Sequence, residues 1–439
     1  MMRSLFSGVA GLKAHQTKMD VIGNNIANVN TTAYKASSMV FSDLMSQTTQ
    51  KASGANATTG TGGVNARQIG LGVKTGAISI NMSGQGASQS TGNAFDMMIT
   101  GSNFFVVNDG HDNYFTRDGS FYVDGAGNLA MSSTGYNVMG WGIDEETQTI
   151  KQDTVQPLRV MSEANLAYPP EATSKAFVSG ILDKNDTNVT STSGKAITLN
   201  FFDTLGYSYT AKMIFKQTSD PTQYTVEVEK VLGSDGKEVD ISGLNFGTHT
   251  IAFDQANGKF SGVDGSTGTT TMNLPMGSVG SSFSDIEIDF STVTMYDNNG
   301  TSTIGATSGD LDGIGTGRSI GKMIGVSVQN NGMIFASYDN GMTKLLGQMA
   351  TAAFSNVSGL EKAGDNLYKS TMNSGEFDGI GVDITAGGGY ISTGQLEMSN
   401  VDLSQEFTEM ITTQRGFQAN SRIITVSDTM IEELTNLKR

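Results

Sequence analysis

Apolar residues recur at helical spacing at both ends of the chain. From Leu5 to Val29 they lie three, four or seven positions apart, so they share one stripe and predict a helix from Ser4 to about Asn28. The same spacing near the C-terminal end predicts a second helix that ends at about Leu437. The stripe positions, which are the candidate assembly residues, are Leu5, Val9, Leu12, Met19, Ile22, Ile26, Leu403, Phe407, Met410, Phe417, Ile424, Ile431 and Leu434.

Polar and charged residues refine the prediction for the two helices. Ser399 or Asn400 is the expected N-cap of the second helix, with Asp402 in its first turn beside the positive end of the helix dipole. Residues 1–30 carry a net charge of +2 and residues 399–439 a net charge of −2. Stripes and charges together predict a lateral, coiled-coil-like pairing of the termini. The alternative is that each stripe faces the core of an ordinary globular domain.

The sequence between the two helices is typical of β-structure. Residues 48–92 are almost free of charge and rich in Gly, Ser, Thr and Asn, which predicts a linker or an extended arm. Short apolar runs separated by Asp-Gly turns follow from Phe95 and predict a small antiparallel β domain. Between Glu145 and Ile320, alternating runs such as AITLNFF predict a second β region, which contains 22 acidic and 11 basic residues.

These patterns predict a mixed, mainly β fold with discontinuous, nested domains. Residues 1–75 and 400–439 are expected to form a helical terminal domain with an extended arm. Residues 76–144 and 321–399 are expected to form an inner β domain, and residues 145–320 an outer β domain inserted into it. The chain of 439 residues suits about three domains.

Charge and cysteine content exclude several classes of function. The net charge of −16 would repel a phosphate backbone, so no nucleic acid is expected as a partner. The absence of cysteine removes disulfides, thiolate metal sites and cysteine nucleophiles. The first 20 residues contain no uninterrupted apolar run and no cleavage site, so a cleaved secretory signal is not expected. No run of 18 apolar residues predicts a membrane span.

The sequence offers no constellation for catalysis. The three histidines, His15, His111 and His249, lie in three different segments, so neither a metal cluster nor a histidine-centred triad is expected. The stretch from Asp310 to Lys322 lacks the first glycine of a phosphate loop and the glutamate that ends a calcium loop. We therefore expect no cofactor, no metal and no enzymatic activity.

Several segments resemble the flagellar axial proteins, a family of rod, hook and hook-associated proteins. The resemblance rests on SLFSGVAGL from Ser4, NNIANVNTTAYK from Asn24, FDMMITGSNFFVV from Phe95, YFTRDGSF from Tyr114 and the closing segment from Val401. One departure is Ala33, where the family pattern often has glycine. The large acidic insertion, with LNFFDTLGYSYTAKMIF, resembles the outer domain of a hook subunit more than the shorter rod proteins.

The resemblance implies a structural subunit that polymerises into a flexible tube and acts as a universal joint. It implies export by the flagellar type III apparatus to an extracellular position, without a cleaved signal. It also implies partners: other copies of the chain, the distal rod protein, the hook cap and the hook-filament junction proteins.

Three other functions stay open at this point. The first is the distal rod protein of the same family. The second is a secreted, β-rich adhesin, which would leave the matched helical termini unexplained. The third is an enzyme carried on an axial scaffold, which would need clustered catalytic carboxylates in a cleft.

Overall fold

The chain folds into two compact units, and it enters each of them more than once. The computed structural model describes residues 2–54, 60, 62–144, 147, 149–241 and 246–437. Unit 1 comprises Met1–Ser162, Val326–Phe335 and Leu345–Arg439, and unit 2 comprises Glu163–Gly325 and Ala336–Lys344. Most of unit 2 is therefore an insertion into the sequence of unit 1.

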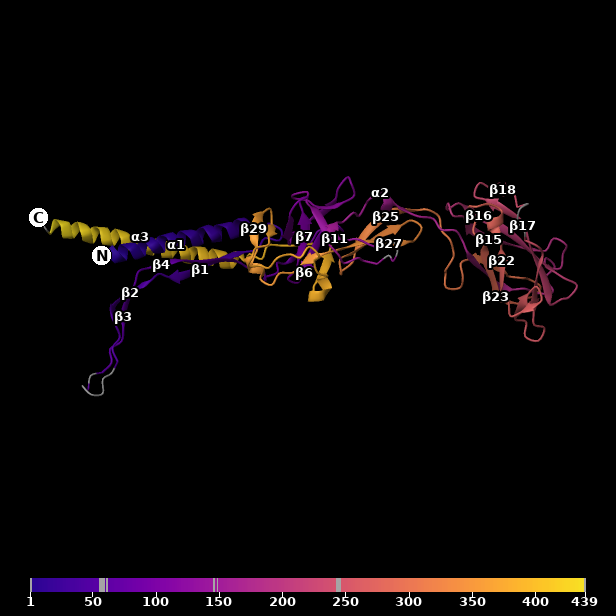
Figure 1. Cartoon of the computed structure of the whole chain (residues 1–439), viewed down its shortest axis with the longest axis horizontal. Helices are drawn as coiled ribbons and strands as arrows, with labels where there is room; N and C mark the ends of the chain where they lie inside the picture. Colours follow the sequence, from indigo (N-terminus) through magenta and orange to yellow (C-terminus); the bar gives the residue numbers. More distant parts are fainter. Residues whose placement is uncertain are drawn as a thin grey trace. The chain divides into compact units, whose positions relative to one another are not determined.

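Two long helices pair within unit 1 (Figure 1). The α-helices are α1 (Met2–Ala27), the short α2 (Glu163–Leu166) and α3 (Leu403–Asn436). Gly8, near the start of α1, lies against Ile424 in the second half of α3. Asn25, near the end of α1, donates a hydrogen bond of 2.8 Å to Oε1 of Glu406 in the first turn of α3. The helices therefore run antiparallel, and the predicted pairing of the termini is confirmed within one chain.

Asp402 is the N-cap of α3. Its Oδ1 accepts hydrogen bonds from the backbone N–H of Ser404 at 2.8 Å and of Gln405 at 3.3 Å. The prediction of Ser399 or Asn400 as the N-cap is wrong. The Asn400 side chain bridges other segments instead, because it accepts from the Ala36 N–H and donates to the carbonyl oxygen of Asn81.

A β-ribbon follows α1. It comprises β1 (Ser37–Asp43), β2 (Ser46–Gln50), β3 (Arg67–Gly70) and β4 (Val73–Ile80). β1 pairs antiparallel with β4, and β2 pairs antiparallel with β3. The backbone of Gly72 packs so closely on α1 that a Cβ there would lie 3.2 Å from Cβ of Ala10. β2 and β3 continue away from the helix pair (Figure 1), and residues 55–59 and 61 of the predicted arm lie outside the described part of the chain.

Short strands build the rest of unit 1. They are β5 (Ser88–Ser90), β6 (Met97–Thr100), β7 (Phe104–Asn108), β8 (Asn113–Thr116), β9 (Phe121–Val123), β10 (Leu129–Met131), β11 (Asn137–Trp141), β12 (Gln156–Pro157), β28 (Thr351–Ala352), β29 (Glu361–Gly364), β30 (Leu367–Lys369), β31 (Tyr390–Thr393) and β32 (Gln395–Glu397). In the main sheet, β11, β7, β8, β30 and β29 are neighbours in that order. Phe105 and Phe121 pack edge to face in the core with ring centroids 5.0 Å apart.

Unit 2 is a β domain in which all strands but β13, which pairs with β25, form two sheets. Its strands are β13 (Ala167–Tyr168), β14 (Lys175–Ile181), β15 (Lys195–Phe202), β16 (Ser208–Gln217), β17 (Gln223–Gly233), β18 (Glu238–Val239), β19 (His249–Phe253), β20 (Phe260–Val263), β21 (Ser266–Thr267), β22 (Thr271–Leu274), β23 (Ile286–Thr294) and β24 (Gly305–Ser308). One sheet has the order β22-β23-β14-β24 and the other β15-β16-β17-β19-β20-β21. Ile197, Leu199 and Phe201 of β15 alternate into one core that also contains Ile288 and Phe290 of β23.

Three further strands and three 3₁₀ turns complete the fold. Three strands contribute residues to both units, namely β25 (Gly321–Val328), β26 (Met333–Tyr338) and β27 (Thr343–Met349). Three turns of 3₁₀ helix occur at η1 (Met276–Ser278), η2 (Val357–Gly359) and η3 (Ile384–Gly387). The predicted fold class, mainly β with packed terminal helices, is confirmed.

Ala33 adopts the left-handed conformation that its family pattern assigns to glycine. Its φ is +55°, its side chain is buried, and its backbone N–H donates to the carbonyl oxygen of Glu397 at 2.8 Å. The turn after α1 therefore keeps its shape without a glycine, at the cost of a strained alanine.

Candidate assembly surface

Four of the seven predicted stripe residues of α3 are partly covered in the folded chain. Met410, Phe417, Ile424 and Ile431 are half-buried and lie seven positions apart, the repeat of a coiled-coil seam. Two small polar residues between these positions, Thr413 and Ser427, are buried.

On α1, one stripe residue is fully covered. Ile22 is buried, Val9 is exposed, and the other stripe residues of α1 are half-buried; these are Leu5, Leu12, Met19 and Ile26. The structure therefore brings most of the predicted α1 positions to the packed side of the helix. They stabilise the pair within the chain.

The predicted stripe residues that remain exposed to solvent lie mainly on α3. Leu403, Phe407 and Leu434 are exposed, Phe407 by 50% of its surface. The structure adds exposed apolar residues that the stripes missed, which are Phe6 on α1 and Ile411, Ile423, Val426, Met430 and Leu437 on α3. The predicted stripes missed them because these residues lie beside or opposite the stripes rather than along them.

These exposed residues form two patches on α3. The first patch contains Leu403, Phe407 and Ile411, and the second contains Ile423, Val426, Met430, Leu434 and Leu437. At about 100° per residue, Phe407 and Met430 point in directions about 140° apart around the helix axis. One helix thus presents two apolar surfaces to two different sides.

Glycines let the two helices approach closely. A Cβ on Gly416 would lie 2.7 Å from Cε1 of the His15 ring, and a Cβ on Gly11 would lie 2.7 Å from Nδ2 of Asn420. The ring of His15 also packs edge to face on Phe41 at 5.3 Å, and its Nδ1 is buried without a hydrogen-bond partner. Burial, and secondarily the charge of Lys18, lower the pKa of His15.

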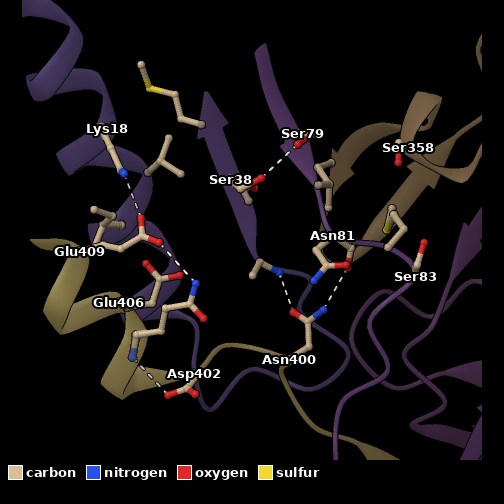
Figure 2. Close-up of a pocket in the computed structure, with 18 residues that line it drawn as sticks. Lys18, Ser38, Ser79, Asn81, Ser83, Ser358, Asn400, Asp402, Glu406 and Glu409 are labelled. Carbon is tan, nitrogen blue, oxygen red and sulfur yellow. Dashed lines mark hydrogen bonds and ion pairs between the residues drawn. The ribbon is translucent and has the colours of Figure 1, made fainter. Parts of the chain in front are cut away.

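A groove of about 390 Å³ lies beside the helix pair (Figure 2). It is lined by residues of α1, α3, β1, β4 and the segments that adjoin them, which include Lys18, Ile22, Ser38, Met39, Ser79, Ile80, Met82, Asn400, Asp402, Glu406 and Glu409. Lys18 Nζ lies 3.1 Å from Oε2 of Glu409, and Figure 2 shows the two side chains pointing toward each other. Burial raises the pKa of Glu406, and the neighbouring charge of Glu409 adds to the rise, while the hydrogen bond from Asn25 opposes it. The groove therefore combines a few apolar side chains with a mostly polar lining, whose charged groups are three carboxylates and one ammonium.

A cluster of buried charged residues connects three segments of unit 1. One segment follows α1, one precedes α3, and one follows strand β8. Lys35 Nζ lies 2.7 Å from Oε1 of Glu397 and donates at 2.7 Å to the carbonyl oxygen of Gly84. Arg117 NH1 lies 3.6 Å from Oε2 of Glu397, and Gly86 N–H donates to its Oε1. Burial lowers the pKa of both Lys35 and Arg117, and the charge of Glu397 opposes this. Sequence reasoning missed this cluster, since these charges are far apart along the chain.

The described part of the chain contains neither a membrane-spanning helix nor a metal cluster. No helix in this part of the chain is long and apolar enough to cross a bilayer. Within the same described ranges, no group of three or more His, Asp or Glu side chains is placed to hold a metal ion.

Three family models match segments of the chain. The model described as Flagella basal body rod protein matches residues 5–35, and Flagellar hook protein FlgE/F/G D1 domain matches residues 98–174. Flagellar basal body rod FlgEFG protein C-terminal matches residues 392–437. The first match covers most of α1 and the last covers α3, the two helices that carry the candidate assembly residues.

Relatives match along the whole chain. The flagellar hook protein FlgE of Treponema pallidum is 36% identical, with 100% of both chains covered, and that of Borreliella burgdorferi is 33% identical at the same coverage. The chain belongs to the flagellar hook protein FlgE family. The flagellar basal-body rod protein FlgG of Bacillus subtilis is 29% identical, also over 100% of both chains. This hook subunit is a structural, non-enzymatic protein of the flagellum, as its sequence indicated.

Proposed function

We propose that this hook subunit polymerises through its terminal helices into a flexible, curved tube that transmits torque from rod to filament. The observation that supports the proposal is the pair of exposed apolar patches on α3, which face different directions. A subunit with two different patches contacts two different neighbours, and such heterologous contacts extend into helical polymers rather than closed dimers.

The predicted assembly residues divide between two tasks in this proposal. The half-buried positions hold α1 and α3 together, and the exposed positions contact neighbouring subunits. The exposed predicted positions are Val9, Leu403, Phe407 and Leu434. Burial of apolar surface is the main driving force for such association, at roughly 25 cal/mol per Å².

In this proposal the β domains form the outer layers of the tube. The division of the chain into a terminal helical domain, an inner β domain over 76–144 and 321–399 and an outer β domain over 145–320 is part of this proposal. Weak, interchangeable contacts between outer domains would let the tube bend as it rotates. Deletion of residues 145–320 should leave tubes that form but bend differently, and unchanged bending would count against this role.

The proposal includes position and partners. The subunit is exported by the flagellar type III apparatus without a cleaved signal, assembles outside the cell beneath a hook cap, and joins the distal rod protein to the hook-filament junction proteins. The family membership supports these partners, and the test for each is co-sedimentation with the polymerised subunit.

Electron microscopy of the concentrated protein tests polymerisation. The wild-type chain should form curved tubes in a kosmotropic salt, which strengthens apolar burial. Phe407→Ser with Ile411→Ser removes one patch, and Val426→Ser with Met430→Ser removes the other. Each pair should leave the chain folded and monomeric.

The matched control is Tyr122→Ser, which removes an exposed aromatic residue from β9, away from the helices. This variant should form tubes as the wild type does. A wild-type chain that stays monomeric under all conditions would refute polymerisation. Straight, inflexible tubes would instead favour the rod function of the FlgG relative.

A further inference from the structure

The arm that carries β2 and β3 lies in a basic segment of an acidic protein. Residues 44–95, which also include β4 and β5, contain three basic side chains, Lys51 and Arg67 on the arm and Lys74 on β4, and no acidic one, although the chain has a net charge of −16. All three basic residues are exposed. Within the described residues, none of them forms an ion pair.

The arm also lacks a surface to pack against. Every residue of β2 and β3 is exposed, and Met45 beside β2 is exposed by 79%. A two-stranded ribbon alone is marginally stable in water. Its exposed apolar residues, with the unpaired Lys51 and Arg67, therefore point to a partner surface that is both apolar and acidic.

The groove beside the helix pair has these properties. Its lining carries Asp402, Glu406 and Glu409 against a single cation, Lys18, which pairs with Glu409 and leaves Asp402 and Glu406 without a cation among the described residues. Apolar side chains also line it, namely Ile22, Met39, Ile80 and Met82. An arginine suits such a site, since its aliphatic stem covers apolar surface while its guanidinium pairs with carboxylates.

The arm of a chain leads away from the groove of the same chain. β1 begins at the groove, which Ser38 and Met39 line, and the ribbon then runs along α1 toward Ala10, where Gly72 packs. Gln50, opposite Arg67, is 11 residues beyond Met39, which corresponds to roughly 36 Å at about 3.3 Å per residue. The ribbon would have to reverse its direction to fill its own groove, so the occupant is a second copy.

We propose that the basic arm of one subunit docks into the acidic groove of a second copy, with Arg67 beside Asp402 and Glu406. This inference rests on the proposed polymerisation and adds to it the contact between neighbours. The arm and the groove of one subunit lie at opposite ends of its β1–β4 ribbon. After one arm has docked, the first subunit still has an empty groove and the second still has a free arm. The contact is therefore head to tail and can be repeated without limit.

Cysteine cross-linking tests the contact in assembled tubes, because the chain contains no cysteine of its own. Gln68→Cys places a thiol next to Arg67 on the arm, and Ser38→Cys places one on the rim of the groove; both residues are exposed. Tubes of mixed single variants, treated with a short bismaleimide, should yield a covalent dimer. Tubes of the double variant should yield a ladder of higher multimers.

Two controls make the result specific. Gln68→Cys mixed with Thr429→Cys, an exposed position on α3 that does not line the groove, should give no dimer. Adding Arg67→Glu to the arm variant should lower the dimer yield by at least about tenfold, because it reverses one charge of a pair. The same change at exposed Lys259 in unit 2 should leave the yield unchanged.

The outcomes separate this contact from polymerisation itself. Tubes that cross-link at Thr429 but not at Ser38, or a double variant that cross-links only within one chain, would overturn the docking while polymerisation stands. If the wild type forms no tubes, polymerisation is refuted, and the docking is refuted with it.

Discussion

Lys35 and Glu397 form an ion pair across 362 positions of sequence. Their Nζ and Oε1 atoms are 2.7 Å apart, and both side chains are almost completely buried. Lys35 follows α1 and Glu397 precedes α3. The pair therefore links the two segments that connect the helices to the β-structure of unit 1. Arg117, which packs over the Phe104 ring at 5.0 Å, anchors this link to that β-structure.

Lys35→Met is expected to lower the free energy of unfolding of unit 1 by about 3–5 kcal/mol, because it leaves the Glu397 carboxylate buried with a poorer partner. The fluorescence of Trp141, the single tryptophan, reports on this unit, since its indole N–H donates to the Ile380 carbonyl inside it. Lys369→Met breaks the exposed pair with Asp112 and should cost about 0–1 kcal/mol. Equal losses in the two variants would contradict the role assigned to the buried pair.

Ala33→Val is expected to destabilise unit 1 by about 2 kcal/mol or more. A β-branched residue is a steric outlier at φ +55°, and the site is buried. Ala33→Gly relieves the strain but loses a buried methyl group and gains chain entropy when unfolded, so it should change stability by less than about 1 kcal/mol. Urea unfolding followed by Trp141 fluorescence measures both, and a harmless valine would refute the left-handed turn.

Gly416→Ala is expected to destabilise the helix pair by about 1–2 kcal/mol. The new Cβ would lie 2.7 Å from the His15 ring, which also packs on Phe41, and this overlap outweighs the gain in helix propensity. Gly23→Ala, in α1 with no atom within 4 Å of its Cβ, should stabilise by roughly 0.5–1 kcal/mol. Thermal unfolding followed by helical circular dichroism should show opposite shifts, and two shifts of the same sign would argue against close packing at Gly416.

Acidification is expected to destabilise the helix pair through His15. Because its pKa in the folded chain lies below the ordinary value of 6.5, the neutral ring is favoured in the fold and the unfolded chain binds the proton first. The stability is thus full above pH 6.5 and falls as the pH drops from there toward the folded pKa. His15→Gln should remove this part of the pH dependence, whereas His111→Gln, at an exposed position, should keep it. A profile unaltered by His15→Gln would show that other groups cause the acid sensitivity.

The two helices were predictable because amphipathic spacing is a local property. The predicted range from Ser4 to about Asn28 became Met2–Ala27, and the predicted end at about Leu437 became Asn436. Alternation and turn residues likewise predicted the strand AITLNFF, which the structure places in β15. The N-cap was misplaced because Asn400, a good capping residue by type, is held by contacts with distant segments.

The sequence alone determined the class of protein: amphipathic termini, a β-rich middle, acidic charge and the segments shared with the flagellar family. The tertiary structure decided which apolar residues pair within the chain and which stay exposed, because both kinds recur at the same helical spacing. It also brought together Lys35, Arg117 and Glu397, and it formed the groove from α1, α3 and the ribbon. Such contacts depend on segments hundreds of positions apart, and no local pattern encodes their distance.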